Sequence, residues 1–402
     1  MRKAASIVAV LAVWCGAACG ERAHTTVIGQ GALKSSMDFS GLTAAGANGA
    51  LFRKTLENDL ARSGYFTVST SGAGAYQVAG SCADGGGGLS VRCQVRDRGK
   101  SYLDKTYSED GKKARRLAHK VADEILLAVK GVKGIASTRI AMVGNVGGKK
   151  DLYLCDADGG GLTRLTQDGA PCIAPRWSPD GNSLIYTSYR NGSPALYVMD
   201  LGTFQWKRVA GYPGLNSGGA YAPDGGTVAL ILSKDGNPEL YTMRLRGGQL
   251  TRVTQSPRVA EASPSWSPDG NRIVYVSNAA GLPHLYIITG QSGSPKRVNA
   301  AGSENVAPDW GPAGIVHSSR REGRYVLCVY DPSSGTDRQP FPLDALDSDE
   351  PSWAPNDRHI VYTRTGGYHS DIYILDLDNP GEPPVRLTTM QGEWYSPAWS
   401  PK

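Results

Sequence analysis

The heptapeptide Pro175-Arg-Trp177-Ser-Pro-Asp180-Gly181 decides the fold of this 402-residue chain, because it recurs along the sequence. Close copies follow at Gly219-Ala-Tyr221-Ala-Pro-Asp224-Gly225 and Pro264-Ser-Trp266-Ser-Pro-Asp269-Gly270. Weaker copies centre on Trp310, Trp353 and Trp399, so the aromatic residue returns every 43 to 46 residues. A period in the forties with strand-forming content is typical of a four-stranded β-propeller blade.

The rest of each repeat agrees with a blade. After the turn comes an alternating strand such as 184–188, then a second strand such as 196–200, and then a short outer strand marked by Arg208-Val209. Ser-Pro-Asp-Gly predicts a type I turn, in which Pro presets φ and Gly relieves the last position. We expect the aspartates to cap these turns rather than bind calcium, and the Trp rings to pack between neighbouring blades.

The two ends of the repeat region complement each other. Residues 139–166 supply three strands without an inner strand, whereas residues 396–402 supply an inner strand with nothing after it. Joined, they make a sixth blade and remove exposed sheet edges. We therefore predict an all-β six-bladed β-propeller over residues 135–402, closed by the C-terminal strand.

Residues 21–134 are predicted to form a small α/β N-terminal domain. Apolar residues at 51, 52, 56 and 60 share one side of a helix that stops at Gly64, and a strand follows over 65–69. A hairpin is expected between strands 76–79 and 89–92. A second helix carries apolar residues from Ala114 to Val129 at helical spacing and ends at Gly131.

The first twenty residues are typical of an export signal. Arg2 and Lys3 precede an apolar run from Ile7 to Trp14, and small residues follow. The run is too short to span a bilayer as a mature helix. We expect residues 1–20 to be removed; the alternative is a lipid anchor at Cys19.

If residues 1–20 are removed on export, the five cysteines that remain lie in a compartment that permits disulfides. If the hairpin turns on Gly87-Gly88, Cys82 and Cys93 fall opposite each other and a disulfide is predicted. If the turn uses all of Asp84 to Gly88, the register slips and the pair separates. Cys155 and Cys172 are expected at opposite ends of their blades.

Patterns for catalysis or cofactor binding are missing from the sequence. No G-x-S-x-G or CxxC occurs, the six histidines are scattered, and 144–150 lacks the spacing of a phosphate loop. Net charge is +6, without a basic run interleaved with aromatics, which argues against nucleic-acid binding. We expect a non-enzymatic protein with no cofactor and no metal.

The ordered combination of these features resembles the TolB family of the Tol–Pal envelope system. The resemblance rests on Asp59 to Gly64, on Ala122 to Ile125 with Gly131 to Ala141, on the Trp-Ser-Pro-Asp-Gly repeats and on Pro397 to Pro401. It implies a periplasmic, monomeric docking protein that binds a Pal-like lipoprotein on one propeller rim and a TolA-like inner-membrane protein through its mature N-terminus, supporting outer-membrane integrity and constriction at division. The segment around Thr25, Thr26, Val27 and Ile28 matches the family's TolA-binding strand only loosely.

The loops that enter the inner strands differ from blade to blade, as expected of contact loops on a rigid scaffold. By resemblance the Pal-like partner would contact the following rim residues: Leu215, Asn216, Ser217, Gly218, Glu261, Ala262, Ser263, Glu304, Asn305, Asp349, Glu350, Glu393 and Trp394. The competing hypotheses are a propeller that binds a small molecule or acts as a lyase, which would need polar side chains converging in the channel, and a hydrolase-derived propeller without its catalytic domain.

Overall fold

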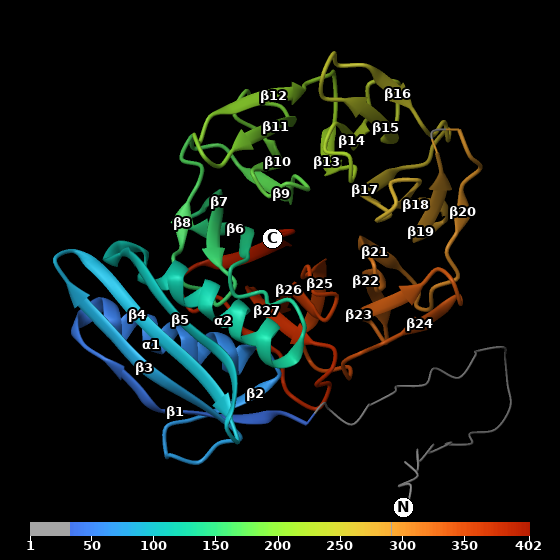
Figure 1. Cartoon of the computed structure of the whole chain (residues 1–402). Coiled ribbons are helices and arrows are strands. Elements are labelled where there is room, and N and C mark those ends of the chain that lie inside the picture. The colour runs from blue at the N-terminus through green and yellow to red at the C-terminus, as the bar shows by residue number, and fades with distance from the viewer. Residues whose placement is uncertain (1–32, 291) are drawn as a thin grey trace, which may run out of the picture.

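The structure, a computed structural model, describes residues 33–290 and 292–402. The predicted signal segment and Cys19 lie outside these ranges. The chain forms an N-terminal sheet with two helices, placed beside a ring of six four-stranded sheets (Figure 1). Neither helix in the described part is long and apolar enough to cross a membrane.

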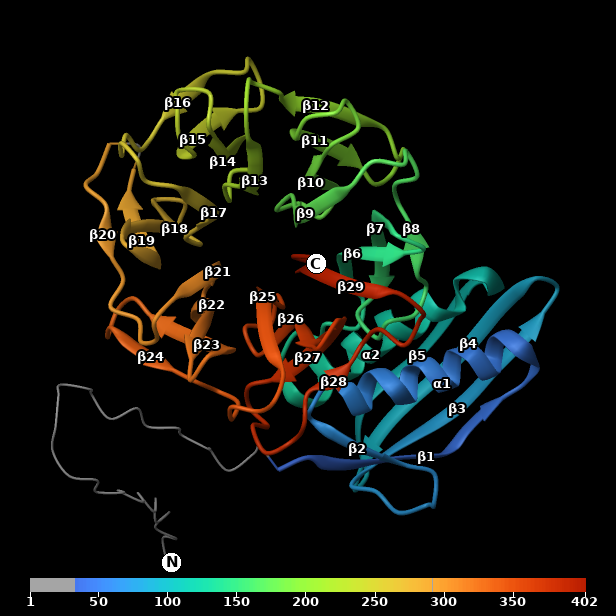
Figure 2. The same cartoon turned by 180° about the vertical axis from the view of Figure 1, so that it is seen from behind.

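The N-terminal domain contains a five-stranded sheet in the order β2-β1-β3-β4-β5. Helices α1 (Gly46–Arg62) and α2 (Ala114–Lys130) contact each other, and α2 lies on the side of the propeller (Figure 2). The strands are β1 (Ser35–Ala44), β2 (Phe66–Ser69), β3 (Tyr76–Gly85), β4 (Gly88–Asp97) and β5 (Lys100–Asp110), and a 3-10 turn, η1, spans Gly111–Lys113.

Strands β1 and β5 were missing from the sequence-based description. Strand β1 carries Ser and Gly among its apolar residues, yet it lies inside the sheet, parallel to both β2 and β3. Strand β5 is mostly polar and forms the sheet edge beside β4. The two predicted helices are confirmed, and α2 ends on Gly131, whose φ of 71° is the left-handed cap that glycine favours.

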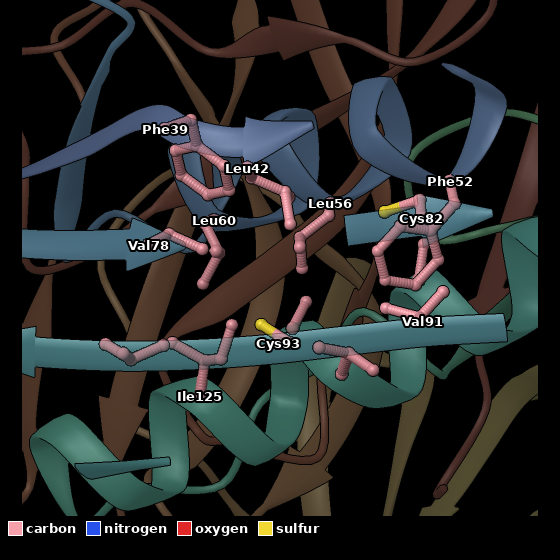
Figure 3. Packing of buried hydrophobic residues seen from close by; sticks show 14 of the residues in the cluster. Phe39, Leu42, Phe52, Leu56, Leu60, Val78, Cys82, Val91, Cys93 and Ile125 are labelled. Carbon is pink, nitrogen blue, oxygen red and sulfur yellow. The ribbon is translucent and has the colours of Figure 1, made fainter. Parts of the chain in front are cut away.

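The core of this domain lies between the sheet and the two helices. Phe52, Leu56 and Leu60 of α1 meet Val78 and Val91 of the sheet, as Figure 3 shows. Ile125 of α2 closes the same cluster. These are the apolar positions of the helical pattern, so local periodicity and the tertiary core agree.

The predicted disulfide between Cys82 and Cys93 is wrong. Gly86 and Gly87, with φ of 61° and 83°, form the turn, so that Cys82 opposes Val91 and Cys93 opposes Gly80. The two cysteines are diagonal neighbours, which lie about 7–8 Å apart in a sheet. A disulfide needs about 4.4–6.8 Å between Cα atoms. Both thiols are free and buried in the core (Figure 3).

Each propeller blade consists of four antiparallel strands, numbered outward from the channel, and strand β29 closes blade 1 by pairing with β6. The blades are blade 1, β29 (Glu393–Trp399), β6 (Arg139–Val146), β7 (Lys149–Asp156) and β8 (Thr163–Arg164); blade 2, β9 (Cys172–Trp177), β10 (Ser183–Ser188), β11 (Ala195–Asp200) and β12 (Trp206–Ala210); blade 3, β13 (Asn216–Tyr221), β14 (Thr227–Leu232), β15 (Glu239–Arg244) and β16 (Leu250–Arg252); blade 4, β17 (Glu261–Trp266), β18 (Arg272–Ala280), β19 (Leu282–Thr289) and β20 (Lys296–Arg297); blade 5, β21 (Asn305–Gly311), β22 (Gly314–Arg321), β23 (Arg324–Asp331) and β24 (Thr336–Arg338); and blade 6, β25 (Asp347–Trp353), β26 (His359–Gly366), β27 (His369–Asp376) and β28 (Val385–Arg386).

The repeated motif plays the structural part that its chemistry predicts. In blade 2 the Asp180 carboxylate accepts hydrogen bonds from the Ser178 hydroxyl and the Asn182 amide, and Gly181 has a φ of 70°. The Trp rings join neighbouring blades: the Trp177 indole donates to the Ala398 carbonyl, and the Trp353 indole donates to the Gly314 carbonyl.

The two domains are joined by polar contacts to blades 1 and 6. Arg358 of blade 6 donates to the Gly64 carbonyl, bonds Asp376 at 2.6 Å and lies over the Tyr65 ring. On blade 1, Arg115 of α2 contacts both Asp156 and Asp158. A cavity of about 100 Å³ lies between the domains and is lined by residues of both. The predicted boundary at 134/135 falls between α2 and β6.

Candidate functional site

The innermost strands of all six blades begin at one mouth of the channel and end at the other. We call the mouth where they begin the loop rim: it comprises the residues entering β9, β13, β17, β21, β25 and β29, and the hairpins between the second and third strands of each blade. Ion pairs join the hairpin residues to the residues that enter the inner strands: Arg190 pairs with Asp168, and Arg320 pairs with Glu304. The connections to the N-terminal domain lie at the other mouth.

A β-bulge interrupts every innermost strand three residues before its aromatic residue. In each blade one residue there has a left-handed backbone with φ between 46° and 64°: Ala174, Gly218, Ser263, Ala307, Glu350 and Ser396. Bulges of this kind bend a strand and re-aim its side chains, and strained residues cluster at binding sites. In each innermost strand, the residues after the bulge repeat from blade to blade. The residues before the bulge lie at the loop rim and differ in sequence between blades.

The predicted contact residues lie mostly inside strands rather than in loops. Leu215 and Glu304 precede their strands, whereas the others occupy the first residues of β13, β17, β21, β25 and β29. Of the predicted set, Ala262 is exposed and the residues Leu215, Ser217, Gly218, Ser263, Glu304, Asp349, Glu350 and Glu393 are partly exposed. The structure brings these together on the loop rim.

Four of the predicted contact residues are buried, and their side chains contact other residues of the propeller. The Asn216 side chain closes its own loop, accepting from the Tyr212 amide and donating to the Tyr212 and Gly214 carbonyls. Trp394, 1% exposed, packs edge-on against Tyr153. Asn305 lies beside His284, and Glu261 accepts from the Leu240 amide. Their residue types gave no sign of this burial.

Acidic side chains gather on the loop rim over blades 5, 6 and 1. Hydrogen bonds from the Tyr325 hydroxyl and from Arg320 lower the pKa of Glu304. In the same way, hydrogen bonds from Tyr395 and Asn145 lower the pKa of Glu393. Glu350 accepts from the Ser396 amide and hydroxyl, both at 2.7 Å. These carboxylates are therefore held in fixed positions.

Two acids of the set lie in a less hydrated setting. Burial raises the pKa of Asp349 to about 6, although part of the residue reaches the surface. Burial also raises the pKa of Glu261 to about 7, against hydrogen bonds from Thr254 and the Leu240 amide that favour the charged form. The nearby Glu239 carboxylate adds to the increase.

Sequence reasoning missed the apolar tips of the neighbouring hairpins. Tyr368 is 99% exposed, and Val146 and Leu282 are also exposed. Val146 ends β6, Leu282 begins β19 and Tyr368 lies between β26 and β27, so all three lie at hairpins of the loop rim. A large apolar residue in a hairpin between two strands is the sequence signal for them, whereas the predicted contact residues come only from the loops that enter the inner strands.

The opposite mouth is lined by the repeated motif and encloses about 390 Å³. Its aromatic and proline residues come from all six blades. Polar side chains there bond to neighbouring blades: Asp309 accepts from the Trp353 amide, Ser265 from the Trp310 amide, and Ser352 from the Trp399 amide. The predicted N-terminal segment, Thr25 to Ile28, lies outside the described residues.

Comparison with known proteins identifies the propeller. The family model described as the TolB beta propeller domain matches residues 127–402. The Tol-Pal system protein TolB of Bordetella avium is 31% identical over 212 residues, which cover 48% of this chain and 48% of that protein. That of Hahella chejuensis is 40% identical over 119 residues, covering 29% and 28%. The chain spans about half the length, or less, of these curated relatives.

A solved structure extends the similarity to both domains. TolB from Acinetobacter baumannii superposes with a TM-score of 0.83 at 26% sequence identity, covering 94% of this chain and 100% of that one. A putative TolB from Agrobacterium tumefaciens, at 20% identity and a TM-score of 0.51, shares the fold.

Proposed function

The chain belongs to the TolB beta-propeller family, and from this premise we propose that it is a non-catalytic periplasmic docking protein of a Tol–Pal system. Its loop rim would bind a Pal-like peptidoglycan-associated lipoprotein. Its mature N-terminus would bind a TolA-like inner-membrane protein. As a monomer with two separate contact sites, it would link the inner membrane to the outer membrane and support outer-membrane integrity and constriction at division.

The arrangement of the loop rim is the observation that carries this proposal. Each inner strand keeps its repeated residues on one side of the bulge and varies on the other. A rigid ring with variable residues at one mouth suits the recognition of one partner surface. The N-terminal domain contacts the propeller at the other mouth, so a partner can approach the loop rim.

The loop rim offers two sectors of different chemistry. Blades 3 and 4 present small and apolar groups, represented by Leu215 and Ala262, whereas blades 5, 6 and 1 present fixed carboxylates. A partner with an apolar contact beside basic groups would complement both sectors. The exposed Tyr368 on blade 6 adds an aromatic group of the kind enriched at interfaces.

Calorimetric titration of the soluble domain of the Pal-like lipoprotein from the same cell tests the loop rim. We expect Leu215→Arg and Ala262→Arg to weaken binding at least about tenfold, or about 1.4 kcal/mol, because each places a long charged chain in the apolar sector. Ala313→Arg makes the same change at an exposed position near the opposite mouth and is the matched control. Normal binding by both rim variants would place the partner elsewhere.

The N-terminal contact is tested separately with the C-terminal domain of the TolA-like protein. A chain that begins at Leu33 should lose this partner and keep the Pal-like one. The rim variants should show the opposite pattern. Loss of both partners in either variant would contradict two independent contact sites.

A further inference from the structure

Blade 5 departs from the other blades at one pair of facing residues. In blades 2, 4 and 6 two tyrosines face each other across the second and third strands, as in Tyr186 opposite Tyr197. Their rings lie 6.0 to 6.3 Å apart. In blade 5 the same register pairs His317 with Cys328. The third-strand position holds Tyr in each of the five other blades.

Asp337 on β24, the outermost strand of blade 5, adds a carboxylate to this pair. A ring nitrogen of His317, the Cys328 sulfur and a carboxylate oxygen of Asp337 all lie within 4.8 Å of one another. His317 and Cys328 are completely buried. The three residues come from β22, β23 and β24, which are hydrogen-bonded neighbours in one rigid sheet. Because they are separated in sequence, no spacing motif indicated them.

The hydrogen bonds of the cluster leave donor atoms available. Asp337 Oδ2 accepts from Arg321 and from the Ala301 amide, whereas Oδ1 faces His317 Nε2 at 3.1 Å. His317 Nδ1 is buried and has no hydrogen-bond partner among the described residues. With the ring proton on Nδ1, the Nε2 lone pair beside Asp337 is free to bind an ion.

Two other kinds of polar cluster in the described residues are closed by arginine. Blades 1 and 6 carry an aspartate near the start of the third strand and close it with an Arg and a Thr, as Asp371 is closed by Arg386 and Thr388. The cluster of His119, Asp156 and Asp158 contains the Arg115 guanidinium, which bonds both carboxylates. In blade 5 the Arg321 guanidinium bonds Asp337 through Oδ2 alone and leaves Oδ1 facing His317.

From this geometry we propose that blade 5 holds a Zn²⁺ ion bound by His317 Nε2, the Cys328 thiolate and Asp337 Oδ1. Imidazole, thiolate and carboxylate are the donors that Zn²⁺ prefers. Two ligand atoms at 2.0–2.1 Å from a tetrahedral ion lie about 3.3 Å apart, close to the 3.1 Å between Nε2 and Oδ1. On binding, the Cys328 thiol proton leaves to solvent, and the ring proton of His317 lies on Nδ1, so that Nε2 and Asp337 Oδ1 no longer share a proton. The ion would join the three outer strands of the blade, independently of partner docking.

Metal retention by the full mature chain tests the proposal. Because the cluster is buried, the protein is unfolded with chelator and reductant and refolded with equimolar Zn²⁺, or without metal. After desalting, elemental analysis should give one zinc per chain. Refolding with Co²⁺ should add a thiolate-to-cobalt absorption band. The zinc-loaded protein should also melt at a higher temperature than the metal-free protein.

Variants assign the ion to this cluster. Cys328→Ser should weaken Zn²⁺ binding at least about tenfold in competition with a chelator, whereas Cys155→Ser, another buried propeller cysteine, should retain it. The double variant His317→Tyr with Cys328→Tyr rebuilds the facing tyrosines of blades 2, 4 and 6, and should fold without retaining zinc. No retained zinc in the parent chain, or zinc that survives in the folded double variant, would overturn the site.

Discussion

At the scale of single residues, the aromatic of each repeat stabilises the propeller by joining two blades. Trp353 is 7% exposed, lies beside the Gly311 backbone and donates its indole hydrogen to the Gly314 carbonyl. Trp266 donates to the Ala220 carbonyl of blade 3, as Trp177 does to the Ala398 carbonyl of blade 1, and is only partly buried. The repeated aromatic residue is therefore expected to contribute differently to the free energy of unfolding in different blades.

We expect Trp353→Ala to lower the free energy of unfolding by about 3–5 kcal/mol, since it leaves a cavity between blades 5 and 6 and an unpaired carbonyl. Urea unfolding followed by far-UV circular dichroism measures the change. Tyr368→Ala removes a fully exposed ring and should change stability by less than about 0.5 kcal/mol. Equal losses in both variants would contradict the packing account.

Glu261 makes stability depend on pH. Its folded pKa of about 7 lies above the ordinary 4.5, so the folded state holds the proton more tightly than the unfolded state. Its contribution is complete below pH 4.5 and is lost as pH rises through 7. We expect Glu261→Gln to be more stable than the parent chain at pH 8, by about 1–3 kcal/mol, and nearly equal at pH 4.5. Denaturant unfolding at both pH values measures this; a constant difference would contradict the assignment.

At the scale of elements, one turn decides the register of the β3–β4 hairpin. Two consecutive glycines with positive φ form a two-residue turn that matches the twist of the strands. Placing the turn at Gly86-Gly87 moves Cys93 two residues from Cys82 without changing the face on which either side chain lies. Both thiols consequently remain in the core, but they do not meet.

We expect thiol titration of an unfolded, unreduced chain that begins at Glu21 to give five free thiols, at Cys82, Cys93, Cys155, Cys172 and Cys328. Prior reduction should leave the count unchanged. A count of three, rising to five on reduction, would show that a disulfide forms in spite of this register.

At the scale of the whole molecule, a buried arginine of the propeller joins the two domains. Arg358 is 5% exposed and connects Asp376 of the propeller to the Gly64 carbonyl of the N-terminal domain. Asn379 donates to the same carbonyl. Lys34 bonds Glu382 across the same boundary, but on the surface. Water and salt screen the surface pair, whereas the buried pair keeps its geometry.

We expect Arg358→Ala to cost about 3–5 kcal/mol, because it leaves Asp376 without its buried partner, and to separate the melting of the two domains in scanning calorimetry. Lys34→Ala removes an ion pair across the same boundary and should change stability by less than about 1 kcal/mol. A single unchanged transition in Arg358→Ala would mean that other contacts hold the domains together.

The sequence by itself determined the six blades and the two N-terminal helices, because both follow from local regularities. A 43- to 46-residue period with its turn motif defines a blade, and apolar spacing defines a helix face. It also located the loop rim, since the order of strands fixes which connections share a mouth.

The tertiary structure decided the rest. Strand β1 is placed by its parallel neighbours, and Asn216, Glu261, Asn305 and Trp394 are buried by contacts from other segments. The left-handed residue of each bulge precedes Pro in five blades, where local preference favours an extended backbone. The bulge, which appears as a register shift between the first and second strands, therefore stands against local preference. The facing pair of His317 and Cys328 likewise arises from register between strands, which no spacing along the chain records.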